Sequence, residues 1–313
     1  MKILVTGCCG FIGYHVSKRL LENDFTVIGI DNFDDYYDIK FKENRLNILK
    51  EYKNFKFEKG DIINTDIISR EKPNKVCHLA SKAGVRNSLE YPKSYVKNNI
   101  EGFINLMEDS VKNDVENFVY ASSSSVYGLN KKVPFCETDV LDSCNSPYAA
   151  SKISMEIFAK TYSQLYDLTL IGLRFFTVFG PEGRPDMAPY KFLKSILNEE
   201  KFLKFGDGNS KRDYTYIDDI VNGVILALEN KNKLKCEVFN LGNSSPVTLN
   251  ELIEKCENVA GKKAIYEEIE DQKGDVPITY ANISKAKSLL NYRPKITLDY
   301  GLLKTCEWIK NLK

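Results

Sequence analysis

The chain has 313 residues, of which 43% are hydrophobic and 28% charged, the composition of an ordinary globular protein. Lysine and arginine (44) almost balance aspartate and glutamate (43), so nothing in the charge suggests nucleic acid or an acidic membrane as a partner. The N-terminal MKILVTGCCG lacks the long apolar stretch and cleavage site of a signal peptide, and no segment approaches the roughly 20 apolar residues of a membrane span. We therefore expect a cytoplasmic protein without membrane contact.

The eight cysteines and two histidines offer little for a metal centre or a hydrolytic triad. Cys8 and Cys9 are adjacent, but no C-x-x-C pair occurs, and the histidines His15 and His78 lack the spacing of a zinc site. Neither histidine stands in a motif that would make it the base of a Ser-His-Asp arrangement. We predict free thiols in a reducing compartment and no metal ion.

The N-terminal segment is predicted to form a βαβ unit around a glycine-rich turn. KILVTG is a short apolar strand, CCGFIGYHVSKRLLEN has the apolar period of a helix, and TVIGID is a second strand. Gly7, Gly10 and Gly13 stand at the first turn, where they let backbone amides and a helix N-terminus approach a pyrophosphate. Their spacing, G-x-x-G-x-x-G, is a variant of the dinucleotide-binding fingerprint.

The acidic residue at the end of the second strand strengthens this interpretation. Asp31 closes TVIGID, where a carboxylate can accept hydrogen bonds from an adenosine ribose. Asn32 and Phe33 follow, with no arginine to meet a 2′-phosphate. The pattern favours NAD over NADP.

Further strand-like runs, FKFEKGD, KVCHLAS and NFVYASSSSVYG, alternate with helical segments. This alternation predicts an α/β fold with a doubly wound parallel sheet of the Rossmann type, which binds ligands at the carboxyl ends of its strands. Several residues fall at those ends and are expected to share one binding edge: Asp61, Ile62, Leu79, Ala80 and the serine run from Ser122 to Ser125.

The segment SPYAASK is predicted to begin a helix, with Ser146 as the N-cap and Pro147 at the first position. Tyr148 and Lys152 then project from one helical face. A tyrosine has a pKa of about 10, which a nearby ammonium and an oxidised nicotinamide ring would lower. Tyr148 is therefore a candidate general base for a sugar hydroxyl.

A strand rich in aromatic residues, RFFTVFG, precedes a proline-braced loop that holds one arginine, Arg184. Farther on, KFLKSILNEE is predicted to be a helix, and DYTYIDDIVNGVILAL is predicted to return a strand and a helix to the first domain. We divide the chain into a cofactor-binding Rossmann domain at 1–173, to which the chain returns around 213–243, and a smaller α/β substrate domain at 174–313.

These segments together resemble the extended short-chain dehydrogenase/reductase family of nucleotide-sugar epimerases and dehydratases. The resemblance covers essentially the whole length, from TGCCGFIG through SSSSVYG, YAASK and RFFTVFGP to DYTYIDDI. It implies that Tyr148 is the catalytic base, Lys152 its electrostatic partner and Ser123 a catalytic hydroxyl. It also implies NAD as the cofactor, with contacts from Gly7, Gly10, Phe11, Ile12, Gly13, Asp31, Asn32, Asp61, Ile62, Leu79, Ala80, Ser81, Lys82, Asn99, Ser122, Tyr148 and Lys152.

Within this family, three segments are similar to those of UDP-glucuronate 4-epimerases: DDYYDIKFKENRL, KAGVRNS and GPEGRPDMA. Dehydratases place Asp-Glu after the catalytic threonine, where this chain has Ser124 and Ser125, so dehydration is disfavoured. Two departures stand out. Lys82 replaces the usual glutamine, and Glu182 replaces the usual tryptophan and adds a negative charge near an anionic substrate.

The resemblance implies a UDP-sugar substrate carrying a carboxylate, interconverted between UDP-glucuronate and UDP-galacturonate. A guanidinium is the natural partner of a carboxylate, so Arg86 and Arg184 are the candidates, with Thr177 as a hydrogen-bond donor. Contacts with the substrate are expected from Arg86, Ser124, Ser125, Thr177, Arg184, Met187, Ala188, Phe205, Arg212, Gln272 and Asp275. A homodimer through helices near residues 95–110 and 148–164 is the family expectation.

Alternative functions remain open at this point. A UDP-glucose/UDP-galactose 4-epimerase would share the base and the cofactor, and a UDP-glucuronate decarboxylase would share the opening oxidation. A redox-sensing regulator on the same fold is the non-enzymatic alternative, but it would be expected to lose the Tyr148 and Lys152 pair that this chain keeps.

Overall fold

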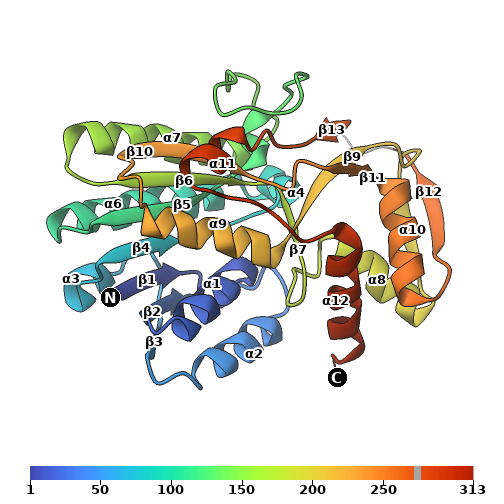
Figure 1. Ribbon diagram of the computed structural model, residues 1–313, viewed down its shortest axis with the longest axis horizontal. Coiled ribbons are helices and arrows are strands. Elements are labelled where there is room, and N and C mark those ends of the chain that lie inside the picture. Colours follow the sequence, from blue (N-terminus) through green and yellow to red (C-terminus); the bar gives the residue numbers. More distant parts are fainter. Residues whose placement is uncertain (271–275, 313) are drawn as a thin grey trace.

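The computed structural model describes residues 1–270 and 276–312, and a large parallel sheet forms the centre of its N-terminal part (Figure 1). Its seven strands lie in the order β10-β6-β5-β4-β1-β2-β3, all parallel. Their bounds are β1 (Lys2–Thr6), β2 (Thr26–Asp31), β3 (Phe55–Lys59), β4 (Lys75–His78), β5 (Asn117–Ser123), β6 (Leu170–Phe175) and β10 (Cys236–Leu241). The predicted doubly wound α/β fold is confirmed.

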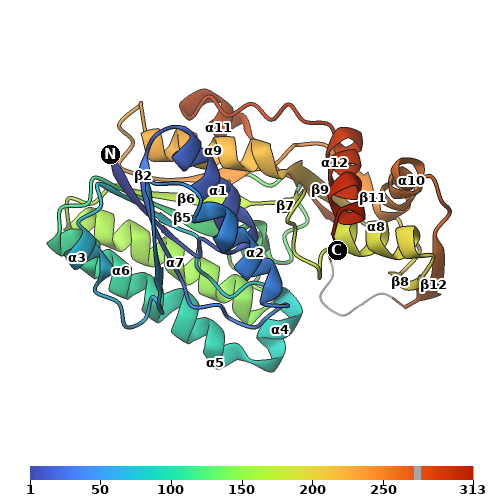
Figure 2. The same cartoon turned by 90° about the horizontal axis from the view of Figure 1, so that it is seen from below.

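Helices cover both faces of this sheet (Figure 2). One face carries α1 (Phe11–Glu22) and α9 (Ile217–Glu229), with α2 (Lys40–Leu49) beside α1. The other face carries α3 (Ile67–Glu71), α4 (Val85–Glu90), α5 (Pro92–Tyr95), the π-helix η1 (Val96–Glu101), α6 (Gly102–Lys112) and α7 (Pro147–Leu165). A 3-10 turn, η2 (Ser124–Tyr127), follows β5, and α11 (Ser284–Leu289) packs against β10.

The two faces of the sheet bury separate hydrophobic clusters, because successive side chains of a strand point to opposite sides. Ile3 and Val5 of β1 belong to the cluster under α1 and α9, whereas Leu4 belongs to the cluster under α6 and α7. Strands buried on both faces explain the continuous apolar runs that the sequence shows.

The smaller C-terminal part contains short strands and longer helices, and lies at the carboxyl end of the large sheet (Figures 1 and 2). Strand β9 pairs with β7, β11 and β13, and β8 pairs with β12. The bounds are β7 (Thr177–Phe179), α8 (Ala188–Asn198), β8 (Lys201–Phe205), β9 (Lys211–Tyr216), β11 (Pro246–Thr248), α10 (Leu249–Ala260), β12 (Ile265–Ile269), β13 (Ile278–Thr279) and α12 (Leu298–Lys310).

The segment RFFTVFG, which the sequence presents as one strand, is divided between the two parts. Strand β6 ends at Phe175 in the large sheet, and β7 begins at Thr177 beside β9 in the small one. The crossing falls at Phe176, whose amide donates to Leu241 O at 3.0 Å. Strand β9 pairs with β7, β11 and β13 of the small part, and α9, which follows it, packs against β5 and β6 of the large sheet. No helix among residues 1–270 and 276–312 is long and apolar enough to cross a membrane.

Candidate active site

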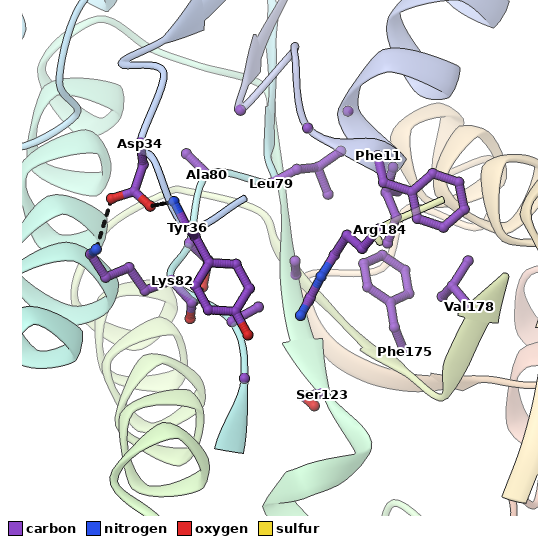
Figure 3. Close-up of a pocket in the computed structure, with 18 of the residues that line it drawn as sticks. Phe11, Asp34, Tyr36, Leu79, Ala80, Lys82, Ser123, Phe175, Val178 and Arg184 are labelled. Atoms are coloured by element: carbon purple, nitrogen blue, oxygen red, sulfur yellow. Dashed lines mark hydrogen bonds and ion pairs between the residues drawn. The ribbon is translucent and has the colours of Figure 1, made fainter. Parts of the chain in front are cut away.

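A cavity of about 440 Å³ opens at the carboxyl ends of the parallel strands, the volume of a small-ligand site. It lies where the strand order reverses, since β1 is flanked by β4 on one side and β2 on the other. Both parts of the protein line it, from the glycine loop after β1 to the loop after β7 (Figure 3). The sequence-predicted edge therefore forms one continuous cleft.

The glycine-rich turn has the geometry of an anion cradle. Gly7 has a φ of +68°, and a Cβ added there would lie 2.8 Å from Ala80 N. A Cβ on Gly13 would lie 2.0 Å from Gly7 O, so only glycine allows this turn to fold against the first turn of α1. The loop thus brings bare backbone to a twelve-residue helix N-terminus, and its residues fit the pyrophosphate of a dinucleotide.

The end of β2 presents acceptors for a ribose. Asp31 is buried, and its carboxylate accepts hydrogen bonds from Cys9 N at 3.1 Å and Phe33 N at 2.9 Å. Asn32 donates to Asp61 Oδ2 at 3.0 Å. Lys42, which the sequence did not suggest, lines the same region with its Nζ 3.9 Å from Asp31 Oδ1. Asp31, Asn32 and Lys42 therefore lie together at the cavity, and Asp61 contacts Asn32 from outside the lining.

The expected helix begins as predicted. Ser146 Oγ accepts a hydrogen bond from Ala149 N at 3.2 Å, and Pro147 occupies the first turn. Tyr148 and Lys152 both line the cavity, with Lys152 Nζ 6.0 Å from the centre of the Tyr148 ring. This helix therefore carries the candidate base and a cation to the same point of the cleft.

Burial controls the ionisation of both residues. It lowers the pKa of Lys152 to about 7, against the opposing charge of Glu156, and Nζ donates to Ala121 O at 2.7 Å. The pKa of Tyr148 is raised by burial, although a hydrogen bond with Ser123 and the positive charge of Arg184 act to lower it. The expected lowering of the Tyr148 pKa is therefore wrong for the protein chain by itself. Desolvation outweighs the charges, and the cation that opposes it is Arg184.

A buried network of ion pairs and hydrogen bonds connects the elements beside the cavity. Sequence patterns did not predict this network. Arg174 of β6 donates twice to Glu156 of α7, Nε to Oε1 at 2.9 Å and Nη2 to Oε2 at 2.7 Å. Its Nη1 donates to Tyr127 Oη at 2.8 Å, and Ser122 Oγ bonds to Glu156 as well. Because each polar group is paired, the network fixes β5, β6 and α7 relative to one another.

The residues predicted to contact a substrate that do line the cavity are Ser124, Ser125, Thr177, Arg184 and Met187, together with the predicted catalytic Ser123. Figure 3 shows Arg184 extending into the cavity near Ser123 and Tyr36. Its guanidinium binds Asp186 through Nε at 3.0 Å and Nη2 at 2.6 Å, and Tyr36 Oη donates to the same carboxylate at 3.2 Å. Asp186 thus orients Arg184 from behind and leaves one guanidinium nitrogen for a ligand.

Glu182 is turned away from this cavity. Its carboxylate accepts hydrogen bonds from Arg45 Nε at 3.2 Å and from Trp308 Nε1 at 3.0 Å, and Arg45 Nη2 donates to its carbonyl at 2.6 Å. The expectation that Glu182 places a negative charge near the substrate is wrong. Its partners are a fully buried arginine of α2 and the indole of α12, far away in the sequence.

Several expected site residues lie outside the lining. Asn99 is buried behind it and bonds the backbone of Lys82, donating to its O at 3.0 Å and accepting from its N at 2.8 Å. Arg86 is exposed, with its guanidinium 5.2 Å from the centre of the Phe205 ring, so it does not share the cavity with Arg184. The cavity lining also leaves out Asp61, Ala188, Phe205 and Arg212, and the predicted residues Gln272 and Asp275 lie outside the described residues.

The lining also includes residues that were not predicted as ligand contacts, although they lie in motifs that the sequence analysis quoted. They come from the segment between β2 and the first turns of α2, from the segment between β4 and the start of α4, and from the crossing between β6 and β7: Asp34, Tyr36, Tyr37, Lys42, Ala83, Gly84, Val85, Phe175, Phe176 and Val178. The available signal for each group was a family resemblance, carried by DDYYDIKFKENRL, KAGVRNS and RFFTVFGP respectively. Within the part of the chain that the structure describes, no group of three or more His, Cys, Asp or Glu could hold a metal ion.

Comparison with known proteins gives a consistent result. Residues 3–242 match the NAD dependent epimerase/dehydratase family. Among curated proteins, the UDP-glucuronate 4-epimerase of Thermodesulfobacterium geofontis is 45% identical over 98% of this chain and 95% of its own. A protein of Methanocaldococcus jannaschii is 47% identical over 98% of this chain and 95% of its own.

Two solved structures are similar to this chain over nearly its whole length. The Bacillus cereus UDP-glucuronic acid 4-epimerase in complex with UDP-glucuronic acid and NAD aligns with a TM-score of 0.95 at 37% identity, over the whole of both chains. The UDP-glucose 4-epimerase of Thermotoga maritima in complex with UDP-glucose aligns with a TM-score of 0.89 at 34% identity, over 99% of each chain. The chain belongs to the NAD dependent epimerase/dehydratase family.

Proposed function

We propose that the protein is a UDP-glucuronate 4-epimerase, which interconverts UDP-glucuronate and UDP-galacturonate with bound NAD. The observation that carries the proposal is the placement of Arg184 in the same cavity as Tyr148, so that one cleft holds a base for O4 and a guanidinium for a carboxylate. The similarity to UDP-glucuronate 4-epimerases over nearly the whole chain agrees with it.

Tyr148 acts as the general base that takes the proton from the sugar O4 and later returns it. Ser123, which shares a hydrogen bond with Tyr148, orients the O4 hydroxyl of the sugar toward the Tyr148 phenol. The positive charge of Arg184 favours the phenolate. Lys152, with its Nζ 6.0 Å from the centre of the Tyr148 ring, is assigned the same role once NAD is bound. The chemistry that NAD supplies when bound is reversible hydride transfer at C4 of the sugar.

The residues around Arg184 explain how a uronate would keep its carboxyl group. A 4-ketone is β to the C6 carboxylate, and loss of CO₂ requires the breaking C–C bond to align with the ketone π system. Arg184, itself oriented by Asp186, would hold the carboxylate near the ring plane, with Thr177 as a further donor. That orientation slows decarboxylation and leaves rotation and return of the hydride as the productive outcome.

The nucleotide end of the substrate is proposed to extend from this cavity toward Arg86, Phe205 and Arg212. Arg86 stacks on the Phe205 ring and offers a flat cationic surface next to the cleft. Residues 1–173 would then carry the cofactor and residues 174–313 the UDP-sugar. A cytoplasmic location fits the proposal, because all eight cysteines are free thiols.

A homodimer through η1 and α7 is part of the proposal. Both elements expose large apolar side chains on the outer face of the helical layer, including Val96, Ile157 and Leu165. Burying such side chains against a second copy is favourable. Tyr148 and Lys152 lie on the opposite, inward side of α7, so a dimer formed this way leaves the cleft open.

The test is a comparison of two substrates with one variant. Arg184→Ala is expected to lower kcat/KM for UDP-glucuronate by about 100-fold, the scale of one charged hydrogen-bond pair in a buried site. UDP-glucose, whose sugar lacks the carboxylate, should lose about tenfold less, because only the effect of Arg184 on the pKa of Tyr148 is then removed. Equal losses for both substrates would contradict the uronate assignment and favour the UDP-hexose 4-epimerase. Release of CO₂ by the wild-type enzyme would favour the decarboxylase.

A further inference from the structure

The loops that follow β2 and β4 contact each other, and both line the cavity. Strand β1 lies between β4 and β2 in the sheet, so any contact between these two loops crosses the carboxyl end of β1. Such a contact exists: Lys82 Nζ lies 2.7 Å from Asp34 Oδ2, as Figure 3 shows. The ion pair therefore spans the part of the cleft where the pyrophosphate cradle lies.

Both ends of this bridge are held in place by their surroundings. The backbone of Lys82 is fixed by the buried Asn99, which bonds both its N and its O. Asp34 accepts a hydrogen bond from Tyr36 N at 3.2 Å, and its carbonyl accepts one from Lys42 Nζ at 2.8 Å. Because both backbones are already fixed, formation of the ion pair costs less conformational entropy than it would for two long side chains on an open surface.

A second contact joins the same two loops. Gly84 has a φ of +101°, and a Cβ added there would lie 2.6 Å from Tyr36 Oη. The hydroxyl of Tyr36 thus fits directly against the backbone of the loop after β4. Tyr36 also donates a hydrogen bond to Asp186, so the contacts between these two loops extend to the loop that carries Arg184.

The environment of the pair is consistent with a bridge that stays formed. Both side chains are about three-quarters buried, with 24% of Lys82 and 26% of Asp34 exposed. Burial by itself raises the pKa of the Asp34 carboxyl, but the hydrogen bond and charge of Lys82 outweigh it and hold the pKa below its ordinary value. A pair that is about three-quarters buried is screened by salt only in part, so it retains much of its attraction at physiological ionic strength.

We propose that Lys82 and Asp34 form a clasp across the cofactor half of the cleft, which must open before NAD can leave. The clasp makes these two residues positioning residues for the cofactor, and it gives a role to a lysine that stands where the family usually has glutamine. The inference rests on the NAD-binding part of the proposed function and does not depend on which sugar is bound.

The experiment measures release of NAD from the purified holoenzyme, by diluting it and assaying free NAD over time with an enzymatic cycling reaction. Lys82→Gln and Asp34→Asn are each expected to speed release about fivefold to tenfold, the scale of one partly buried ion pair. The double variant should release NAD no faster than either single variant, because both substitutions break the same contact. Raised salt should speed release from the wild type more than from the variants.

A matched control is available in Lys285 and Glu237, an ion pair of similar exposure that joins α11 to β10 outside the cavity lining. Lys285→Gln should leave the release rate unchanged, and thermal unfolding of each variant checks that the fold is retained. Release unchanged in Asp34→Asn but faster in Lys82→Gln would mean that Lys82 binds the cofactor directly, and would overturn the clasp. Wild-type rates in all variants would overturn it too. A wild-type protein that neither contains nor takes up NAD would instead contradict the proposed function.

Discussion

Glu182 and Arg45 form an ion pair, Nε to Oε2 at 3.2 Å, that ties the loop carrying Arg184 to helix α2. The arginine is fully buried and also donates to Cys9 O at 3.0 Å and Tyr37 Oη at 2.8 Å. One guanidinium thus joins the glycine turn, the loop after β2 and the Arg184 loop. The acidic residue that looked misplaced beside an anionic substrate is a structural anchor.

Replacing this anchor is expected to destabilise the protein. Glu182→Ala leaves the Arg45 charge buried without its ionic partner and removes the acceptor of Trp308 Nε1, which should cost about 3 kcal/mol of unfolding free energy. Glu182→Gln offers one acceptor to two donors and should cost less. Urea denaturation of the three proteins measures both values. Equal stability of Glu182→Ala and wild type would show that the pair contributes nothing.

The same substitution tests which way the carboxylate points. Because the Glu182 side chain faces α2 and α12, Glu182→Gln should leave KM for UDP-glucuronate within about twofold of the wild type at pH 7.5. Steady-state kinetics on the folded variant provides the measurement. A severalfold fall in KM would mean that the substrate feels this negative charge.

Removing the phenol of Tyr148 should abolish turnover while leaving the fold intact. Tyr148→Phe is expected to lower kcat by at least about 1,000-fold, because no other described residue on the helix offers a proton acceptor at that position of the cavity. The bound NAD content of the purified protein should stay the same. Tyr162→Phe, the same change about four turns farther along α7, is the matched control and should retain wild-type kcat. Full activity in Tyr148→Phe would refute the assigned base.

The buried His78 should make the protein sensitive to acid. Burial lowers the pKa of His78 to about 3, and its Nδ1 lies 2.9 Å from Thr6 Oγ1 beneath the cavity floor. The unfolded chain takes up a proton near pH 6.5 whereas the folded one does not, so stability is present above pH 6.5 and is lost as the pH falls toward 3. Between pH 7 and pH 5 the loss from this residue should be about 2 kcal/mol.

His78→Asn isolates this effect, since asparagine does not titrate and retains a polar group toward Thr6. The free energy of unfolding of the variant should fall less steeply than that of the wild type between pH 7 and pH 5. His15, whose pKa burial lowers to about 4, contributes a similar slope to both proteins and cancels in the difference. Parallel curves for the two proteins would show that His78 is not the source.

The outer face of α7 should control the oligomeric state. Ile157→Asp places a charge in the middle of the proposed dimer interface and is expected to shift the protein from dimer to monomer in light scattering coupled to gel filtration. Leu203→Asp, a similarly exposed leucine on β8 in the smaller part, is the control and should leave the dimer intact. A dimer in the Ile157→Asp variant would place the interface elsewhere.

Local sequence patterns were sufficient for much of the fold. Ser146 and Pro147 predict the N-cap of α7. The spacing of three glycines predicts the glycine turn, where a side chain would clash with the backbone. Alternating strands and helices led directly to the parallel sheet, and Tyr148 and Lys152 meet in the cleft because they share a helical face.

Contacts between distant segments could not be foreseen in the same way. Glu182 meets Trp308 across 126 positions of the chain, and Lys82 meets Asp34 across 48. Arg86 and Arg184 looked equivalent as carboxylate partners, but only the packing of their loops places one in the cavity and the other on the Phe205 ring. The pKa of Tyr148 was misjudged for a related reason, because the extent of burial is a tertiary property.

The identity of the reaction product tests the central proposal most directly. The purified holoenzyme is incubated with UDP-glucuronate, and the sugar products are identified by NMR. The proposed function predicts UDP-galacturonate, with C6 retained and no CO₂ released. A pentose product or its 4-keto precursor would show decarboxylation, and no turnover of the uronate together with epimerisation of UDP-glucose would show a hexose epimerase; either result would contradict the proposal.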